Sequence, residues 1–173
     1  MWLSLDPARQ RPLQPSLALA LALGLDATAG WAALHQRAES VARVRALTRA
    51  HGLPLVLSFH DFQRTPGDED LQARFAQAHR LQADVAKLAV MPQSMEDVHR
   101  LLGATLQASR SLPIPVISMA MGGLGAVRRL CGGAFGSALT FAVGSAPSAP
   151  GQMPIEDVRA AIAVLQRAVH SRE

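Results

Sequence analysis

The chain has 173 residues, of which 49% are hydrophobic and 17% are charged. This length and composition indicate one globular domain with a sizeable core, and they exclude a disordered chain. The formal net charge is +4. The basic residues are scattered along the chain, without the aromatic-interleaved basic runs that are typical of nucleic-acid binding. The excess positive charge therefore fits an anionic small molecule better than nucleic acid.

Cysteine and histidine content argues against a metal centre. Cys131 is the only cysteine, which excludes an internal disulfide and a cysteine-based zinc site and favours a reducing compartment such as the cytoplasm. The six histidines do not fall at metal-ligand spacing. We therefore expect no metal.

The N-terminal part of the sequence allows two interpretations. Leu and Ala alternate over residues 17–23 between Arg11 and an Ala-Thr-Ala triplet, which loosely resembles a signal peptide. The alternative is a buried strand over residues 17–25, because the alternation has period two. The strand is favoured by three prolines before the run and an acidic residue after it: Pro7, Pro12, Pro15 and Asp26. We expect an irregular segment over residues 1–16 and, since the run is far shorter than ~20 residues, no membrane span.

From residue 31 onwards, helix-like and strand-like segments alternate. Residues 31–50 predict a helix, with Leu34, Val41, Val44 and Leu47 at helical spacing, and residues 53–59 predict a buried strand. Thr65 is expected to cap the next helix, because a proline follows it and Asp68 stands three positions after it.

The same alternation continues to the end of the chain. Residues 85–90 predict a second strand, after which Ser94 and Asp97 form a capping pair for the next helix. Strands are also expected over residues 114–121 and 138–143, and a last helix begins at Pro154. Strands that recur every ~25–30 residues with helices between them indicate a parallel sheet, either an open doubly wound sheet or a (β/α)8 barrel.

Lys87 is the sharpest chemical signal in the sequence. Sixteen of the seventeen basic residues are arginines, and the one lysine lies within a predicted strand. A buried lysine shifts its pKa readily and can attack a ketone to form an iminium, which a guanidinium cannot do. The alternative is a lysine that reaches solvent from a strand end.

His60 ends the preceding predicted strand, so it is expected to face the same pocket as Lys87 at the carboxyl ends of the strands. There it could act as a general base and then as a general acid. The alternative is a histidine that caps the strand end or bonds to Asp61. The five other histidines lie in helical or terminal stretches and are expected to face solvent.

Two further segments lie at the same end of the predicted sheet. The glycine-rich stretch 122–125 could bind an anion, but it does not match a dinucleotide-binding motif, and a tight strand-to-helix turn is favoured. Of Arg128 and Arg129 beyond it, one could clamp a carboxylate and the other is expected to be solvated. Residues 145–152 form a small, polar loop that is either a lid or an ordinary linker.

Five stretches of the sequence resemble, in the same order, motifs of the type I 3-dehydroquinate dehydratase family. They are Ser-Phe-His-Asp-Phe-Gln-Arg-Thr-Pro at 58–66, Ala-Lys-Leu-Ala-Val-Met-Pro-Gln at 86–93, Ser-Met-Ala-Met-Gly at 118–122, Phe-Gly-Ser-Ala-Leu-Thr-Phe at 135–141 and Ser-Ala-Pro-Gly-Gln at 148–152. The resemblance implies an α/β fold of the (β/α)8 barrel family. Residues 17–173 would form its C-terminal part, about strands 4–8.

The resemblance also implies a cofactor-free lyase of the shikimate pathway that converts 3-dehydroquinate to 3-dehydroshikimate. Lys87 would form an imine with the C3 ketone of the substrate. His60 would remove a proton from C2 and later protonate the leaving C1 hydroxyl. Arg129 would bind the carboxylate. Further substrate contacts are implied for Ser148, Gln152, Met119, Met121 and Phe141.

The family resemblance has a limit. It implies a cytoplasmic homodimer without nucleic-acid or membrane partners, but the family's first three strands have no counterpart in this sequence. The family's acidic partner of the catalytic histidine belongs to that missing part. The alternatives are therefore a catalytically impaired or inactive fragment of the enzyme, or another Schiff-base barrel such as a class I aldolase. The aldolase leaves the 60–66 and 148–152 motifs unexplained.

Overall fold

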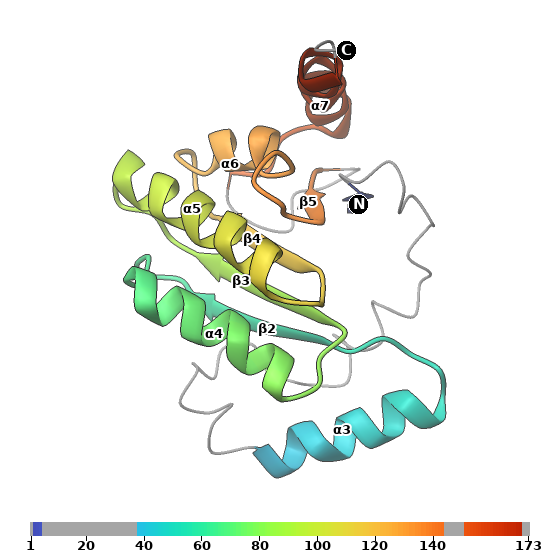
Figure 1. The fold of residues 1–173 in the computed structure, drawn as a ribbon. Coiled ribbons are helices and arrows are strands. Elements are labelled where there is room, and N and C mark those ends of the chain that lie inside the picture. Colours follow the sequence, from blue (N-terminus) through green and yellow to red (C-terminus); the bar gives the residue numbers. More distant parts are fainter. Residues whose placement is uncertain (1, 5–37, 144–150, 171–173) are drawn as a thin grey trace.

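The computed structural model describes residues 2–4, 38–143 and 151–170. Helices and strands alternate along most of this chain (Figure 1). In chain order they are β1 (Trp2–Ser4), α3 (Ala38–Ala50), β2 (Val56–Asp61), α4 (Asp68–Arg80), β3 (Val85–Val90), α5 (Met95–Ser111), β4 (Val116–Ala120), α6 (Ala126–Cys131), β5 (Leu139–Phe141) and α7 (Ile155–His170). The expected strand over residues 17–25 and the start of the expected 31–50 helix lie outside the described residues.

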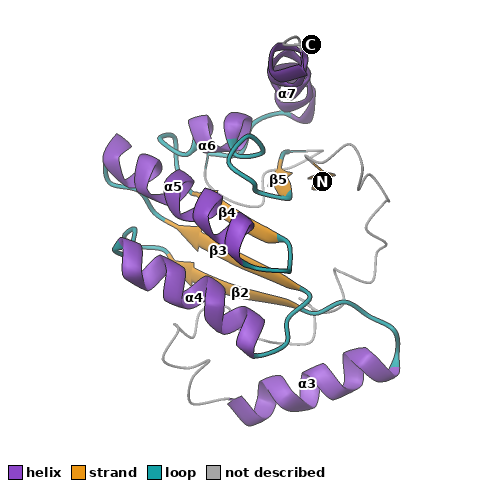
Figure 2. Cartoon of the chain, viewed as in Figure 1, coloured by secondary structure: helices purple, strands orange, loops and turns teal. Residues whose placement is uncertain are grey.

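Strands β2, β3 and β4 form a parallel sheet in that order. Helices α4 and α5 connect them and both cover one face of the sheet, as Figure 2 shows. This is the βα arrangement that the alternation of segments predicts. Helices α4 and α5 lie on the same side of the sheet, as in the wall of a barrel, and the same arrangement occurs within one half of a doubly wound sheet.

A second, two-stranded sheet pairs β1 with β5 in antiparallel fashion. The strand Trp2–Ser4 lies within the segment 1–16, for which we expected irregular structure, and differs from that expectation. An isolated parallel bridge between Val116 and Ser137 connects the segment before β5 to the start of β4. The β5 segment therefore lies beside the parallel sheet.

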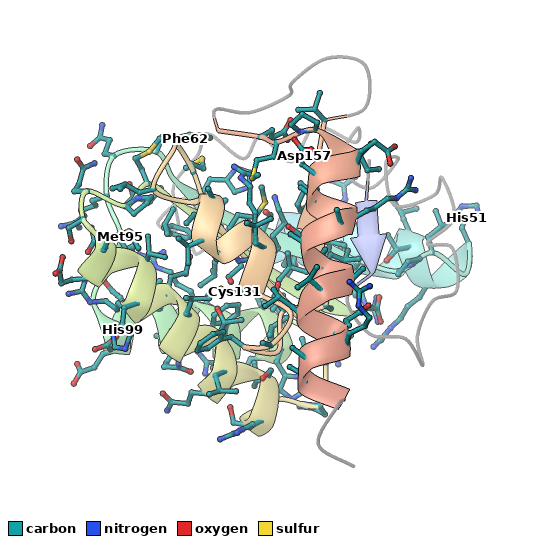
Figure 3. The ribbon with its side chains drawn as sticks, turned by 90° about the horizontal axis from the view of Figure 1, so that it is seen from above. His51, Phe62, Met95, His99, Cys131 and Asp157 are labelled. Carbon is teal, nitrogen blue, oxygen red and sulfur yellow. The ribbon has the colours of Figure 1, made fainter. Side chains whose placement is uncertain are left out.

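The main core lies between the sheet and its helices. Leu71 and Phe75 of α4 and Leu101 of α5 are fully buried against the apolar residues of β2, β3 and β4 that point toward them. Burial of this kind is the main favourable contribution to folding. Phe62 and Met95 remain exposed at the periphery (Figure 3).

The first turns of α4 and α5 differ in how well the sequence predicts them. Ser94 is the N-cap of α5, and its hydroxyl accepts a hydrogen bond from the backbone N–H of Asp97, as expected. For α4 the expectation is wrong. The helix begins at Asp68 with Gly67 as N-cap, and the buried hydroxyl of Thr65 has no hydrogen-bond partner among the described residues.

The glycine-rich stretch after β4 is the tight turn that we favoured. The N–H of Gly125 donates to the carbonyl oxygen of Gly122 at 3.2 Å. A Cβ atom at Gly125 would lie 1.9 Å from the backbone oxygen of Ala120, so only glycine allows α6 to begin this close to the strand end. Across the described ranges, no helix is both long and apolar enough to cross a membrane.

Candidate active site

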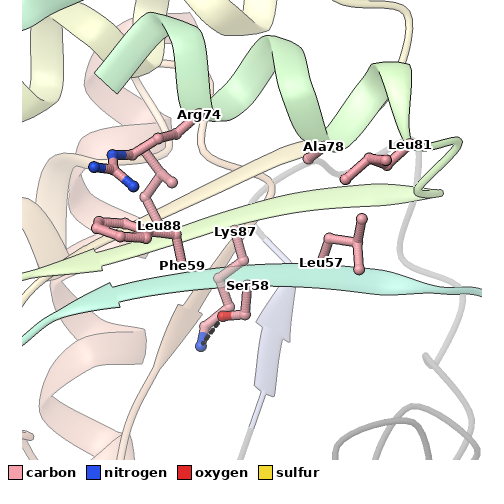
Figure 4. A pocket seen from close by; sticks show the side chains of 8 residues that line it. All are labelled: Leu57, Ser58, Phe59, Arg74, Ala78, Leu81, Lys87 and Leu88. Atoms are coloured by element: carbon pink, nitrogen blue, oxygen red, sulfur yellow. Dashed lines mark hydrogen bonds between the residues drawn. The ribbon is translucent and has the colours of Figure 1, made fainter. Parts of the chain in front are cut away.

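The register of β2 and β3 places three polar side chains on one face of the sheet. Ser58 pairs with Lys87, and His60 pairs with Ala89, two positions further along β3. Because side chains alternate between faces along a strand, Ser58, His60 and Lys87 share the face opposite α4. Figure 4 shows this division, with Arg74 and Ala78 of α4 on one side of the strands and the Lys87 and Ser58 head groups on the other.

The three polar groups touch one another. The Nζ atom of Lys87 lies 2.9 Å from Nε2 of His60 and 3.1 Å from Oγ of Ser58. The Ser58 Oγ and His60 Nε2 atoms are also 2.9 Å apart. Lys87 and His60, which the sequence led us to expect at one site, are in contact, whereas Ser58 was not among the expected residues. Its position two residues before His60 in a strand was the available signal.

Aromatic rings flank this cluster. The Lys87 ammonium lies 5.7 Å from the centroid of the Phe141 ring, within the range of a cation–π contact. The His60 ring meets the Phe62 ring edge-on with centroids 5.6 Å apart. Phe141 therefore lies beside the amine, and β5 contributes to the same site as β2 and β3.

Burial makes the Lys87 amine easier to deprotonate. Its side chain is only 7% exposed, and desolvation lowers its pKa from 10.5 to about 8. At pH 7 an amine with that pKa is about 10% neutral, compared with about 0.03% for an ordinary lysine. Burial is thus what turns this lysine into a usable nucleophile at neutral pH.

The His60 imidazole is neutral at pH 7. Desolvation and, to a smaller extent, the positive charge of Lys87 lower its pKa to about 4. A neutral imidazole can accept a proton, as a general base must. The alternative partner, Asp61, is occupied elsewhere, because its Oδ1 accepts from the backbone N–H groups of Gln63 and Arg64. Within the described ranges, no carboxylate bonds to His60.

The two arginines of α6 are both buried. Arg128 donates to the hydroxyl groups of Ser118 and Ser137, and burial together with the charge of Arg129 lowers its pKa to about 9. The expectation that the second arginine is solvated is therefore wrong, because these hydroxyls replace water around Arg128. The backbone of Arg129 is tied to β5, since its carbonyl oxygen accepts from the Thr140 hydroxyl at 3.1 Å. Among the described residues, the hydrogen-bond partners of Lys87 are Ser58 and His60.

Two of the remaining implied contacts, Met119 and Met121, lie at the carboxyl end of β4. Met119 pairs with Ala89, which itself pairs with His60, so its side chain shares their face. Met121 follows the strand and is buried. Phe141 ends β5.

The segment that carries Gln152 packs directly against this strand end. Gly151 has φ +71, and a Cβ atom there would lie 2.2 Å from the backbone oxygen of Gly122. Glycine is required at this close approach. Gln152 is thereby held next to the turn that follows β4. Ser148 lies outside the described residues.

Other titratable groups lie away from the site. His51, His79 and His99 are exposed, as expected, and His51 and His99 lie at the periphery of the molecule in Figure 3. His35 and the side chain of His170 are not described. Over the part of the chain that the structure covers, no three His, Cys, Asp or Glu side chains gather as they would around a metal ion.

Comparison with known proteins matches the motifs and the geometry to one family. The family model for type I 3-dehydroquinase matches residues 25–168. The 3-dehydroquinate dehydratase of Geobacillus thermodenitrificans is 55% identical over 127 residues, which are 73% of this chain and 49% of that protein. That of Albidiferax ferrireducens is 54% identical over 130 residues, or 75% of this chain and 49% of that protein. The chain thus spans about half the length of these relatives.

Solved structures that resemble this chain are also 3-dehydroquinate dehydratases. A crystal structure of 3-dehydroquinate dehydratase from Geobacillus kaustophilus superposes with a TM-score of 0.74 at 55% identity, covering 78% of this chain and 51% of that one. The type I enzyme from Clostridium difficile, crystallised with covalently modified comenic acid, gives a TM-score of 0.72 at 36% identity over 76% of this chain and 52% of that one. The (β/α) barrel fold class is confirmed by these neighbours. By its sequence, its fold and the model it matches, this chain belongs to the type I 3-dehydroquinase family.

Proposed function

We propose that this chain carries the Schiff-base chemistry by which 3-dehydroquinate is converted to 3-dehydroshikimate. One observation supports this above the others: the Lys87 amine, with its pKa lowered to about 8, lies 2.9 Å from a neutral His60 imidazole. A nucleophile and a base within hydrogen-bond reach are the arrangement that covalent catalysis requires.

The first step is formation of the imine. The neutral Lys87 amine attacks the C3 carbonyl carbon of the substrate and an Nζ–C3 bond forms. The carbonyl oxygen leaves as water with one amine proton and one proton from solvent, so that Nζ keeps a single N–H. The resulting iminium withdraws electrons from C2 and makes its proton acidic. His60 Nε2, next to Nζ, then takes that proton.

Elimination and hydrolysis complete the cycle. The electron pair released at C2 expels the C1 hydroxyl, which leaves as water with the proton that His60 returns. A second water hydrolyses the iminium, giving the ketone of 3-dehydroshikimate and the free Lys87 amine. The net change is the loss of one water from the substrate, with no change of oxidation state and no cofactor.

The proposed substrate contacts follow from the family resemblance and from position in the fold. Arg129 binds the substrate carboxylate, and Ser148 and Gln152 close over the ligand. Met119, Met121 and Phe141 line the pocket, an assignment supported by their places at the strand ends and by the contact of Phe141 with Lys87. A cytoplasmic homodimer belongs to the same proposal and is supported by the resemblance. Sedimentation of the purified chain tests the dimer.

The proposal is tested by trapping the imine. Lys87 is the only lysine, so borohydride reduction with 3-dehydroquinate can label only this residue and the N-terminal amine. We expect an adduct on the Lys87 peptide, identified by mass analysis. Lys87→Arg keeps the positive charge but removes the side-chain amine, and should give neither an adduct on the peptide of residue 87 nor turnover.

Two results would decide against the proposal. Turnover that persists in Lys87→Arg would rule out a Schiff base on this residue. Absence of an adduct in a well-folded wild-type chain would favour the alternative, an inactive relative of the enzyme. Cooperative thermal unfolding of the same samples serves as the folding control.

A further inference from the structure

Ser58 contacts both atoms that carry the proposed chemistry. Its Oγ atom lies 3.1 Å from the Lys87 Nζ and 2.9 Å from the His60 Nε2. The dashed line in Figure 4 marks the first of these bonds. Because Ser58 belongs to β2, a strand paired in register with β3, its hydroxyl is held in place by the sheet.

Before the reaction, the Ser58 hydroxyl can accept one of the two hydrogens of the neutral Lys87 amine, as a count of hydrogens and lone pairs shows. The neutral His60 ring offers one lone pair at Nε2 when its proton is on the other nitrogen. A neutral Lys87 amine has two hydrogens and one lone pair. If the two hydrogens are accepted by Ser58 Oγ and His60 Nε2, the amine lone pair is left free to attack a carbonyl carbon.

The need for Ser58 increases once the imine has formed. A protonated imine has a single N–H at Nζ, and this hydrogen needs an acceptor. His60 Nε2 is not available while it takes the C2 proton. Among the described residues, Ser58 and His60 are the hydrogen-bond partners of Nζ, so Ser58 Oγ is the acceptor that remains.

We propose that Ser58 is a third catalytic residue, whose hydroxyl holds the iminium N–H of Lys87 and thereby leaves His60 free to move the proton. The inference rests on the proposed function. Ser58 keeps its own proton throughout. Its oxygen accepts the iminium N–H, and the direction of its hydrogen bond with His60 Nε2 follows the protonation of that nitrogen. Ser58 fixes the plane of the iminium so that the C2–H bond is presented to His60.

Three variants test this inference. Ser58→Ala removes the hydroxyl. Ser58→Thr restores it on a side chain that suits a strand. Ser118→Ala is the matched control, because Ser118 is also a buried serine of the parallel sheet but bonds to Arg128 and Thr105 on the helix-covered face.

The first readout uses 3-dehydroquinate. In Ser58→Ala we expect kcat and the rate of borohydride-trapped adduct formation to fall about ten- to a hundredfold, as for the loss of one hydrogen bond to a charged group. KM should change by less than about threefold, since the hydroxyl touches Nζ and not the substrate's binding groups. Ser58→Thr should recover most of the rate. Ser118→Ala should unfold at a lower temperature without this loss of kcat.

A second readout does not depend on the substrate. Formaldehyde also forms an N–H iminium on Lys87, and cyanoborohydride reduces it to a methylamine that peptide mass analysis detects. Methylation of Lys87, measured relative to the N-terminal amine of the same chain, should be slower in Ser58→Ala than in wild type and Ser58→Thr.

The two readouts separate this inference from the proposed function. If wild type forms no adduct with 3-dehydroquinate, the proposed function fails, while the formaldehyde result still decides the role of Ser58. Equal rates of Lys87 methylation in wild type and Ser58→Ala would overturn the inference. So would equal loss of kcat in Ser58→Ala and Ser58→Thr, because the change would then follow strand packing and not the hydroxyl.

Discussion

At the scale of single residues, the chemistry of Lys87 has a cost in stability. An unfolded lysine holds its proton up to about pH 10.5, whereas the buried amine releases it at about pH 8. Between these values the unfolded chain binds more protons than the folded chain, so stability should rise with pH across this window. Below pH 8 both states are protonated and the whole cost of burying the ammonium is present. At 1.36 kcal/mol per pH unit, that cost is about 3 kcal/mol.

Lys87→Met should therefore stabilise the fold at pH 7. Methionine has a similar length without the charge, and Ser58 and His60 remain bonded to each other at 2.9 Å. We expect a gain in the free energy of unfolding of up to about 3 kcal/mol at pH 7, measured by urea denaturation, and a much smaller gain near pH 10. Lys87→Arg keeps the charge and should show no gain. Equal gains at both pH values would mean that burial of the charge is not the cause.

The site residues that the sequence predicts best are those whose chemistry is unusual for their position. A single lysine among arginines inside a strand identified Lys87, and the parallel strands placed His60 beside it, because strand period and strand order are encoded locally. Ser58 stands two residues before His60 and so shares its face, but its contact with Lys87 depends on the register of β2 and β3, which the sequence does not give. Arg128 was misjudged because its burial depends on hydroxyl groups that are distant in sequence.

At the scale of elements, the order of strands and helices follows from hydrophobic pattern and spacing. The exact ends of an element depend on which partners its terminal backbone groups bond to. The expected strand over residues 53–59 is observed at Val56–Asp61, because the Leu55 N–H bonds to the Asp84 carboxylate and not to a neighbouring strand. Val41 and Leu47 both fall at helical spacing on α3, yet Val41 is buried and Leu47 is 57% exposed. Helical periodicity alone does not say how wide the buried stripe of a helix is.

The two helix starts offer a direct comparison. The Ser94 hydroxyl caps α5, so Ser94→Ala should lower the free energy of unfolding by about 1 kcal/mol. Thr65→Val should cost nothing or stabilise the protein, because the Thr65 hydroxyl is buried without a partner among the described residues, and removing it relieves a desolvation penalty. Urea denaturation of the two variants checks this. A loss in Thr65→Val as large as in Ser94→Ala would mean that Thr65 caps α4 after all.

At the scale of the whole molecule, a buried polar network joins β4 to α5, to α6 and to the segment before β5. Arg128 of α6 bonds to Ser118 of β4 and to Ser137 before β5, and Thr105 of α5 donates to Ser118 at 2.7 Å. Four segments are thus joined around one guanidinium that is 1% exposed. No acidic side chain in the described ranges forms an ion pair with it, so its charge is balanced only by hydroxyl dipoles.

Such a buried cation should contribute through its volume more than through its charge. Arg128→Ala leaves a cavity among α5, α6 and β4 and should lower the free energy of unfolding by about 3 kcal/mol or more. Arg128→Met fills much of the same space and removes the desolvation cost of the guanidinium. Ser118 still accepts from Thr105, and Ser137 still donates to the Leu139 carbonyl oxygen.

The methionine variant should therefore be about as stable as wild type at pH 7, as when buried ion pairs are replaced by apolar residues of similar volume. Denaturant unfolding of both variants measures the difference. If Arg128→Met lost as much stability as Arg128→Ala, the hydrogen bonds of the guanidinium would be what holds β4, α6 and the β5 segment together. The site around Lys87 would then depend on a cation on the far face of its own sheet.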